Sequence, residues 1–541
     1  MSVKRGLVPL VVVALVALVY WPGLHGFWTR DDFMQLAFAR LVGSPWPLFV
    51  RDHYFPVPGS VFRPLGFASF WLWQALFGTD YFAHAFGDML LHVAVCLALY
   101  RVLRGAWLER TPAVLCTLLF AVHPVVLGTA LWWSARFDLL ATLFALIAVR
   151  AAFDCVDRPR AGSLLVVLAS LLAALLSKET ALAGAAAIGM VWLRTAWADR
   201  ARRGQALRAV GALVVLVLLF FAWRTAVLGT LGSGLAGDAP LVDALGRGFA
   251  DWIANLPGYL LLSSGTGSVL QAAIVAALMI VLVALAAGLG DDERRPFSLG
   301  AIDLLVCGAC VFVLPAVLQA PVAALNAAPF RADASAVETA MQSRLYYLSF
   351  AGLALALGAA VGRVWSDTRV PRAAVATAFA IGTGVAAWIS HGHAAAFAAR
   401  TSVPRAMAVG VAAAVDRIAT ARDRCDVAVL GSERPPEWAI YVSMDSVTKA
   451  LSTNIERTGR CFVHADYPTF FNLMRGDATP TGAWPYTPHE NQGHPVPWLH
   501  VGDLVAAYLD PPVNADANGV VFLRYENGAF VETAADPAAL H

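Results

Sequence analysis

The run VPLVVVALVALVYW at residues 8–21 carries no charged side chain, and a short aromatic stretch separates it from WTRDDF at residues 28–33. An uninterrupted apolar run of this kind predicts a helix in the hydrocarbon of a membrane. Asp31 and Asp32 then stand where the chain leaves that hydrocarbon. Because carboxylates are costly to desolvate, the acidic pair indicates either a functional site at the membrane edge or a chance position in water.

The composition of the 541-residue chain excludes an ordinary soluble protein. Hydrophobic residues make up 59% of it, charged residues make up 14%, and the mean hydropathy is +0.65, as is typical of a polytopic membrane protein. The formal net charge is +2 and the arginines are spread through short loops, which gives no indication of nucleic-acid binding. MSVKR precedes the first apolar run without a small-residue cleavage site after it, and this predicts an uncleaved signal anchor.

Further apolar runs of spanning length follow the first, so we predict about eleven transmembrane helices. These runs lie near residues 83–103, 111–131, 137–153, 163–178, 181–197, 209–227, 268–289, 301–320, 345–363 and 373–390. Basic residues gather in every second connection, as at Arg202 and Arg203 after the sixth run and at Arg369 and Arg372 after the tenth. By the positive-inside rule these connections and the N-terminus are cytoplasmic, so an odd number of spans puts the C-terminal segment on the far side.

From about residue 400 the composition changes to that of a small α/β domain. The segment RCDVAVLGSERPPEWAIYVSMDSVTKAL at 424–451 predicts a strand, a loop and a helix, and RCFVHAD at 460–466 predicts a second strand. GVVFLRYENGAFVE at 519–532 predicts a hairpin with an Asn-Gly turn.

We therefore predict an α-helical transmembrane domain over residues 1–395 and a periplasmic α/β domain over residues 400–541. Usage rich in alanine and arginine, together with this second domain, favours the inner membrane of a bacterium. The α/β domain contains Cys425 and Cys461, each at the start of a predicted strand. In an oxidising compartment they form either a disulfide between neighbouring strands or two unpaired buried thiols.

Polar residues inside and beside the spans are the candidates for a functional site. Arg63 stands in VFRPLGF, where it suits either a phosphate oxygen or lipid headgroups at the interface. In the second span His84, Asp88 and His92 share one helix face. The three residues cover more than two turns, which is too long for one metal ion, so we favour hydrogen bonds between helices.

Three segments add further ionisable residues on the predicted far side. HPVVLGTALWWSARFDLL at 123–140 contributes His123, Arg136 and Asp138, the last of which also suits dipole capping of the next helix. The other two are SKET, with Lys178 and Glu179, and SRLYYLS, with Arg344, Tyr346 and Tyr347. Cations and acids on one side of the membrane are what a polyprenyl-phosphate headgroup and a general base require.

The order of these elements resembles the GT-C glycosyltransferases: an acidic pair, FRPL, HP with a later RFDLL, SKE and RLYYLS. It is most similar to the transmembrane-and-TPR-containing O-mannosyltransferases and their bacterial relatives. The resemblance covers roughly residues 20–185 and 340–360. It implies transfer of a sugar from a polyprenyl-phosphate donor to an acceptor on the lumenal or periplasmic face, without a nucleotide sugar.

The resemblance also implies roles for individual positions. Asp31 corresponds to the first acid of the family's pair and is the expected general base, with Asp32 as its partner. The residues expected to bind the donor phosphate are Arg63, Arg136, Lys178 and Arg344, and those expected to support them are His123, Asp138, Glu179 and Tyr346.

The chain departs from the family pattern in several places. Asp88 replaces an asparagine, Gly128 replaces a glutamate, Ala135 replaces a glycine, and the α/β domain replaces the tetratricopeptide tail. These departures bear on the acceptor more than on the reaction.

We thus predict a membrane glycosyltransferase whose partners are a lipid-linked monosaccharide, a protein or glycan acceptor and the bilayer. No cofactor is required, because the cations can replace a divalent ion, although the acids leave room for a metal. The alternatives are a transporter or flippase of lipid-linked saccharides, and a transferase that modifies lipid A or a cell-wall glycan. Transporters usually place polar residues at the midplane, whereas here they stand at one rim.

Overall fold

The computed structural model describes most of the helical part of the chain and four strands. The described residues are 7–29, 32, 35, 39, 43–51, 61–105, 108–157, 160–230, 241–261, 300–326, 343–366, 370–421, 425–430, 461–465, 520–526 and 529–533. They belong to two compact units. The first comprises Met1–His25, Gly59–Gly66 and Phe82–Phe397, and the second comprises Gly26–Pro58, Phe67–Tyr81 and Ala398–His541.

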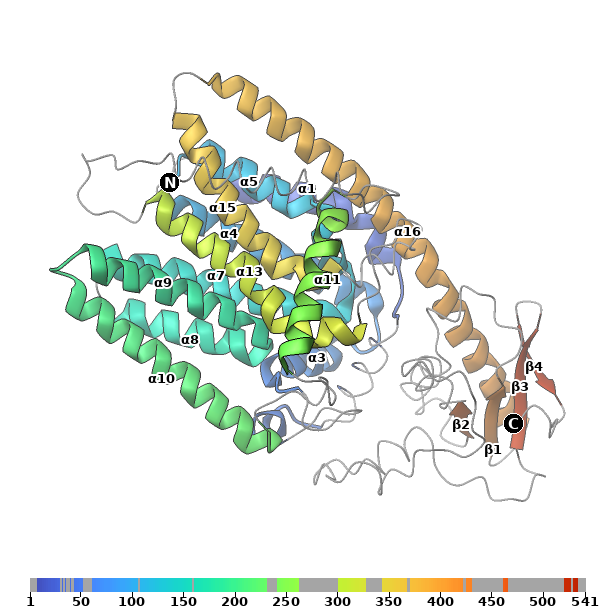
Figure 1. The fold of residues 1–541 in the computed structure, drawn as a ribbon. Coiled ribbons are helices and arrows are strands. Elements are labelled where there is room, and N and C mark those ends of the chain that lie inside the picture. The colour runs from blue at the N-terminus through green and yellow to red at the C-terminus, as the bar shows by residue number, and fades with distance from the viewer. Residues whose placement is uncertain are drawn as a thin grey trace. The chain divides into compact units, whose positions relative to one another are not determined.

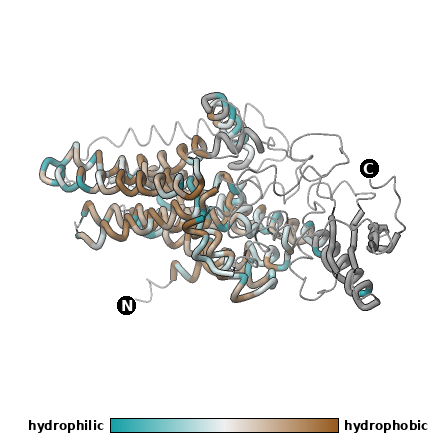
Figure 2. The backbone as a smooth tube through the Cα atoms, turned by 90° about the horizontal axis from the view of Figure 1, so that it is seen from below, coloured by the Kyte–Doolittle hydropathy of each residue, from teal (hydrophilic) through white to brown (hydrophobic). Residues whose placement is uncertain are grey.

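Apolar helices build the first unit (Figure 1), and hydrophobic residues run along most of their length (Figure 2). Its helices are α1 (Leu7–Tyr20), α4 (Tyr81–Gly105), α5 (Arg110–Val122), α6 (Leu127–Leu131), α7 (Arg136–Asp157), α8 (Ala161–Ser177), α9 (Leu182–Ala198), α10 (Arg203–Leu228), α11 (Leu241–Leu261), α13 (Ala301–Asn326), α15 (Tyr347–Ser366) and the first part of α16 (Arg372–Ala421). Helix α3 (Pro64–Phe77) begins in the first unit and continues into the second.

Among the described residues, 7 helices are long and apolar enough to cross a membrane, and 8 if a bent pair counts as one span. The bent pair turns by 53° between α5 and Pro124–Leu131, where Pro124 cannot continue the helix and the ring Nδ1 of His123 accepts a hydrogen bond from Val125 N at 3.2 Å. The predicted run at 268–289 lies outside the described residues. The multi-span prediction is therefore confirmed, while the count of eleven stays a prediction.

Helices α13 and α15 pack against each other in the middle of the first unit (Figure 1), and glycines let their backbones approach closely. A Cβ atom on Gly308 would lie 2.6 Å from Ala356 N, and one on Gly352 would lie 2.6 Å from Val311 C. Only glycine fits at such a crossing, as is common where membrane helices meet.

Buried polar groups join several helices of this unit. The His92 ring contacts the Tyr347 hydroxyl at 2.8 Å and Ala121 O at 2.9 Å. A carbonyl only accepts, so Nε2 of His92 carries the proton and Nδ1 accepts from Tyr347. The hydroxyl of Tyr20 also donates to Ala121 O, at 3.1 Å. The predicted interhelix hydrogen bonding of the second span is thus confirmed at His92.

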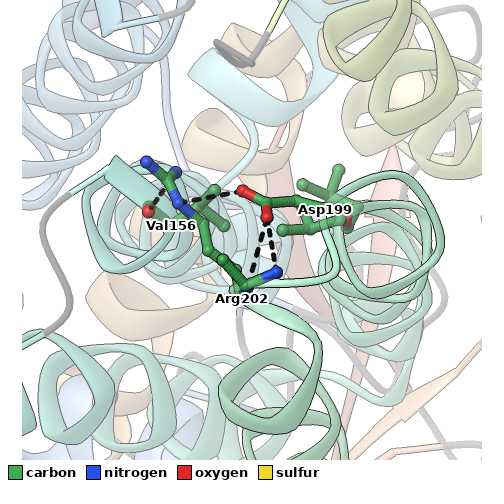
Figure 3. A network of polar contacts seen from close by, with 6 residues as sticks. Val156, Asp199 and Arg202 are labelled. Carbon is green, nitrogen blue, oxygen red and sulfur yellow. Dashed lines mark hydrogen bonds and ion pairs between the residues drawn. The ribbon is translucent and has the colours of Figure 1, made fainter. Parts of the chain in front are cut away.

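The connection between α9 and α10 is held by a polar network (Figure 3). The Asp199 carboxylate accepts from Ala201 N at 2.9 Å and lies 3.3 Å from Arg202 Nε. Arg202 also donates from Nη1 to Val156 O at 2.8 Å and so satisfies a carbonyl at the end of α7. Arg202 therefore has a structural role at this end of the unit.

The second unit contains a four-stranded sheet of β1 (Cys425–Leu430), β2 (Cys461–Ala465), β3 (Val520–Glu526) and β4 (Ala529–Thr533) (Figure 1). The strand order is β2-β1-β3-β4; β1 is parallel to β2 and β3, whereas β3 and β4 are antiparallel. The two predicted strands and the hairpin are confirmed. The helix expected within 431–451 lies outside the described residues.

Candidate functional site

Arg63 and Glu179 form a partly exposed ion pair at one end of the first unit. The Glu179 Oε2 atom accepts from Nε and Nη2 of Arg63, both at 3.0 Å. The Arg63 guanidinium also lies 5.4 Å from the Phe137 ring centroid. Gly66 makes this approach feasible, because a Cβ atom there would collide with the Phe137 ring. The side chains keep 22% and 27% of their exposure, so a ligand can reach both charges.

Lys178 follows α8 directly and pairs with the first turn of α7. Its Nζ atom lies 2.6 Å from Asp138 Oδ1, and the side chains are only 7% and 4% exposed. The ammonium of Lys178 is also repelled by the guanidinium groups of Arg63 and Arg344. These three cations therefore interact electrostatically with one another through Lys178.

Arg344 stacks on an aromatic wall. Its guanidinium carbon lies 4.2 Å from the ring centroid of Trp132, which is buried. The Trp132 indole Nε1 is a buried donor with no hydrogen-bond partner among the described residues. Tyr346, in the same short helical turn as Arg344, stacks on Trp252 with ring centroids 5.6 Å apart and donates to its carbonyl at 3.4 Å, which fixes the start of α15.

Arg136 is the most deeply buried of the four predicted cations. Its Nε atom lies 2.6 Å from Asp88 Oδ1, with side-chain exposures of 1% and 2%, and Nη2 donates to His84 O at 3.4 Å. The guanidinium also lies 5.5 Å from the Trp133 ring. Asp88, where the family pattern has asparagine, thus supplies the negative charge that neutralises Arg136.

One cation of this region escapes sequence reasoning. Arg224, near the end of α10, is buried and interacts electrostatically with Glu179 and Arg63. The only sequence signal for it is a lone arginine in the otherwise apolar run FFAWRTAVL. Such a signal resembles that of an interfacial arginine, so the tertiary structure was needed to recognise it.

Asp32, the second residue of the predicted acidic pair, belongs to the second unit. The carboxylate of Asp32 accepts a hydrogen bond from Thr29 N at 3.0 Å, the Asp32 N–H donates to Thr29 O at 3.1 Å, and the side chain is buried. Asp31 lies outside the described residues. The bonds of Asp32 fix the turn that follows the first span.

His123 contributes to the shape of the region more than to its charge. Its ring caps the helical turn after the bend and packs against Phe350 with centroids 4.3 Å apart. Among the described residues, no group of three histidine, cysteine or acidic side chains has a spacing that suits a metal ion.

Sequence comparison gives two relatives, and no family model matches the chain. An undecaprenyl phosphate-alpha-4-amino-4-deoxy-L-arabinose arabinosyl transferase of Pseudomonas fluorescens is 28% identical over 132 residues, which are 24% of this chain and 23% of that protein. The mouse protein O-mannosyl-transferase TMTC1 is 32% identical over 173 residues, 29% of this chain and 18% of that protein. The chain resembles GT-C glycosyltransferases. The matches span less than a quarter of either relative.

Solved structures give distant likenesses. ArnT from Cupriavidus metallidurans bound to undecaprenyl phosphate has a TM-score of 0.45 at 13% identity, over 88% of this chain and 89% of that one. The oligosaccharyltransferase AglB from Archaeoglobus fulgidus has a TM-score of 0.38 at 14% identity, over 73% of this chain and 56% of that one.

Proposed function

We propose that this protein is a membrane glycosyltransferase that moves a monosaccharide from a polyprenyl-phosphate donor to an acceptor outside the cytoplasm. The observation that carries the proposal is the gathering of Arg63, Lys178 and Arg344 at one end of an apolar helical unit. Charged groups inside a membrane protein are costly unless they serve a ligand or one another. Here Glu179 pairs with Arg63, Asp138 pairs with Lys178, and the Arg344 guanidinium lies over the Trp132 ring.

The reaction would change the charge of the donor phosphate at this site. The acceptor hydroxyl loses its proton to Asp31 as its oxygen forms a bond to the anomeric carbon of the sugar. The bond from that carbon to the phosphate oxygen breaks, and the electron pair remains on the phosphate. A diester monoanion thereby becomes a monoester with about two negative charges. Positioned cations would stabilise that growing charge, which is usually the larger electrostatic contribution.

Arg63 and Arg344 are the residues that we assign to direct phosphate contact, because both are partly exposed. Lys178 is buried against Asp138 and would act at slightly longer range. Arg136, neutralised by Asp88, would hold the Trp133 ring in place. The sequence predicted that all four cations bind the phosphate in the same way. The assignment here gives direct contact to the two partly exposed arginines and indirect roles to the two buried cations.

The relatives suggest two versions of the substrate pair. One carries undecaprenyl phosphate and an amino-arabinose in its name, and the other is named for O-mannosylation of protein. Both names describe the transfer of a sugar, so the substrates that we propose are a pentose or hexose on a polyprenyl phosphate and an acceptor with a hydroxyl group. We place the active site, with the α/β domain, in the periplasm of a bacterium, as the alternation of arginines predicts.

The direct test uses the full-length protein in liposomes with defined undecaprenyl-phosphate sugars, and follows the release of undecaprenyl phosphate together with acceptor glycosylation. Arg63→Ala and Arg344→Ala should each lower kcat/KM by about tenfold or more, since a charge-assisted contact contributes roughly 1.5–3 kcal/mol. The matched control is Arg208→Ala, since Arg208 is exposed and bonds only within its own helix among the contacts described. Arg202 is unsuitable because of its structural bonds.

The same liposomes separate the proposal from a flippase. Movement of intact lipid-linked sugar across the bilayer, with no transfer to any acceptor, would overturn it. Mass spectrometry of periplasmic glycans and glycoproteins from a deletion strain would then identify the acceptor.

A further inference from the structure

Two contacts fix the chain around the turn that carries Asp32. The buried ring of Trp28 packs edge-on against the ring of Tyr81, with centroids 5.0 Å apart. Thr29 and Asp32 bond to each other twice, through the carboxylate and through the backbone N–H of Asp32. All four residues belong to the second unit. A turn built in this way keeps its position only if the chain that leads into it is also held.

Helix α16 holds the chain that leads into this turn. The Phe27 N–H donates at 3.0 Å to Oγ1 of Thr401, in the part of α16 that belongs to the second unit. The Thr401 hydroxyl donates its own proton to Ala398 O within the helix, at 3.1 Å. Because a hydroxyl has one proton and two lone pairs, the oxygen remains able to accept from Phe27. A single hydroxyl therefore joins two segments that are 374 residues apart.

Thr401 lies on the narrow buried face of α16. Neighbouring side chains of this helix point outward: Trp388 is 78% exposed, and Ser402 is exposed as well. On the buried face Ser390 donates to Val122 O at 2.7 Å, in the first unit. The buried residues recur every three or four positions, as one face of a helix requires: Ala386, Ser390, Ala394, Phe397 and Thr401. Hydroxyls on this face thus bond to the backbone of other segments, and Thr401 serves the segment that leads to the acidic pair.

We infer that Thr401 is a positioning residue for the proposed general base, because its hydroxyl holds the backbone that leads to Asp31 and Asp32. This inference rests on the proposed function. A displacement of about 1 Å can lower the rate of a positioned reaction about a hundredfold. Arg63 and Lys178, which we assign to the donor phosphate, belong to the first unit. Loss of the Thr401 hydroxyl should therefore slow the reaction and leave the affinity for the lipid donor unchanged.

The test compares Thr401→Val, which keeps the branched shape but has no hydroxyl, with Thr401→Ser, which keeps the hydroxyl. Full-length protein is assayed in liposomes for the release of undecaprenyl phosphate and for acceptor glycosylation. In Thr401→Val kcat per folded molecule should fall about tenfold or more, and Thr401→Ser should restore most of it. Titration with undecaprenyl phosphate, followed by native mass spectrometry, should give the wild-type Kd for both variants.

Thr195→Val is the matched control. Thr195 is also buried in a helix, and its hydroxyl donates to Val191 O at 2.8 Å within α9. This variant should keep the wild-type kcat and Kd. A loss of kcat in Thr401→Val that is accompanied by an equal loss of lipid affinity would assign Thr401 to donor binding and contradict the inference.

Hydrogen exchange, measured by mass spectrometry, reports the bond without reference to any activity. The backbone amides of residues 26–32 should exchange faster in Thr401→Val than in the wild-type protein or in Thr401→Ser. Unchanged exchange would mean that Thr401 does not hold this segment. Faster exchange with a wild-type kcat, or a lower unfolding temperature alone, would give Thr401 a purely structural role and overturn the inference.

A second variant covers a failure of Thr401→Val to fold. Thr401→Ala removes the same oxygen with a smaller side chain, and it should give the same loss of kcat and the same faster exchange. A wild-type protein that transfers no sugar would overturn the proposed function and, with it, the role of Thr401 in the reaction. The exchange measurement separates the two cases, because it still shows whether Thr401 holds the segment.

Discussion

The Nζ atom of Lys178 lies 2.6 Å from Oδ1 of Asp138, and this buried pair joins the end of α8 to the first turn of α7. Asp138 is 40 residues from Lys178 in the sequence. In the sequence alone, capping of the helix dipole is enough to explain an aspartate in the first turn of α7. The pair shows instead that the two connections on this side of the first unit are fixed to each other. Arg63 and Arg344 both interact electrostatically with Lys178, so this lysine is part of the charged region that they form.

Removing one member of this pair should destabilise the protein more than removing both. Asp138→Ala leaves a buried ammonium without its counter-charge, and the expected loss is about 3–5 kcal/mol. Thermal unfolding of the purified protein in detergent should show a lower midpoint for Asp138→Ala and for Lys178→Met, with partial recovery in the double variant. Equal and additive effects would mean that the two side chains do not interact.

Asp31→Asn should abolish transfer while the protein still inserts and folds. An amide has nearly the shape of a carboxylate but cannot accept a proton, and loss of a general base lowers the rate by about 10²–10⁴. Transfer is measured in liposomes, and folding is monitored by thermal unfolding.

Asp32→Asn serves as the comparison for Asp31. Because the Asp32 carboxylate accepts from Thr29 N, this change should lower stability more than it lowers the rate per folded molecule. A wild-type rate in Asp31→Asn would remove Asp31 from the mechanism.

Gly352→Ala should destabilise the crossing of α13 and α15. The added methyl would lie 2.6 Å from the carbonyl carbon of Val311, which is backbone and cannot rotate away. We expect a loss of about 1–3 kcal/mol, as for other overpacked sites. Gly382→Ala on α16 is the matched control, because no atom lies within 4 Å of the added group. A Gly352→Ala protein as stable as the control would contradict the packing described.

Cys425 and Cys461 should form a disulfide in the isolated protein. They are direct partners in the register of the parallel strands β1 and β2, and neighbouring strands place paired Cα atoms within the range that disulfides span. Bridge formation removes two protons and two electrons, which a disulfide-bearing thiol oxidant of the periplasm would accept. Non-reducing peptide mapping should recover the cross-linked pair.

The control for the disulfide is Cys425→Ser, which should lower the unfolding temperature only under non-reducing conditions. Two free thiols in protein taken from an oxidising compartment would contradict the disulfide. A phosphatase fused after residue 541 reports the compartment independently, and a cytoplasmic result would overturn the predicted topology.

Sequence alone determined the features that depend on local chemistry. The length of apolar runs such as 83–103 and 209–227 predicted α4 and α10, because a spanning helix must present uninterrupted hydrocarbon to lipid. Short strand-like segments and an Asn-Gly turn predicted β1, β2 and the β3–β4 hairpin. Charged residues are rare at the ends of membrane spans, so the sequence alone identified four candidates for the site: Arg63, Lys178, Glu179 and Arg344.

Only the tertiary structure decided which charge meets which. Arg136 and Asp88 are 48 residues apart and Arg63 and Glu179 are 116 apart, so no local pattern indicates either pair. The tertiary structure also buries Arg136 and leaves Arg63 partly exposed. The ring of Phe62, next to Arg63, packs against Trp223, next to Arg224. The physical reason is that charge pairing and desolvation depend on distances between helices, whereas the sequence of a single span records only that span's preference for lipid.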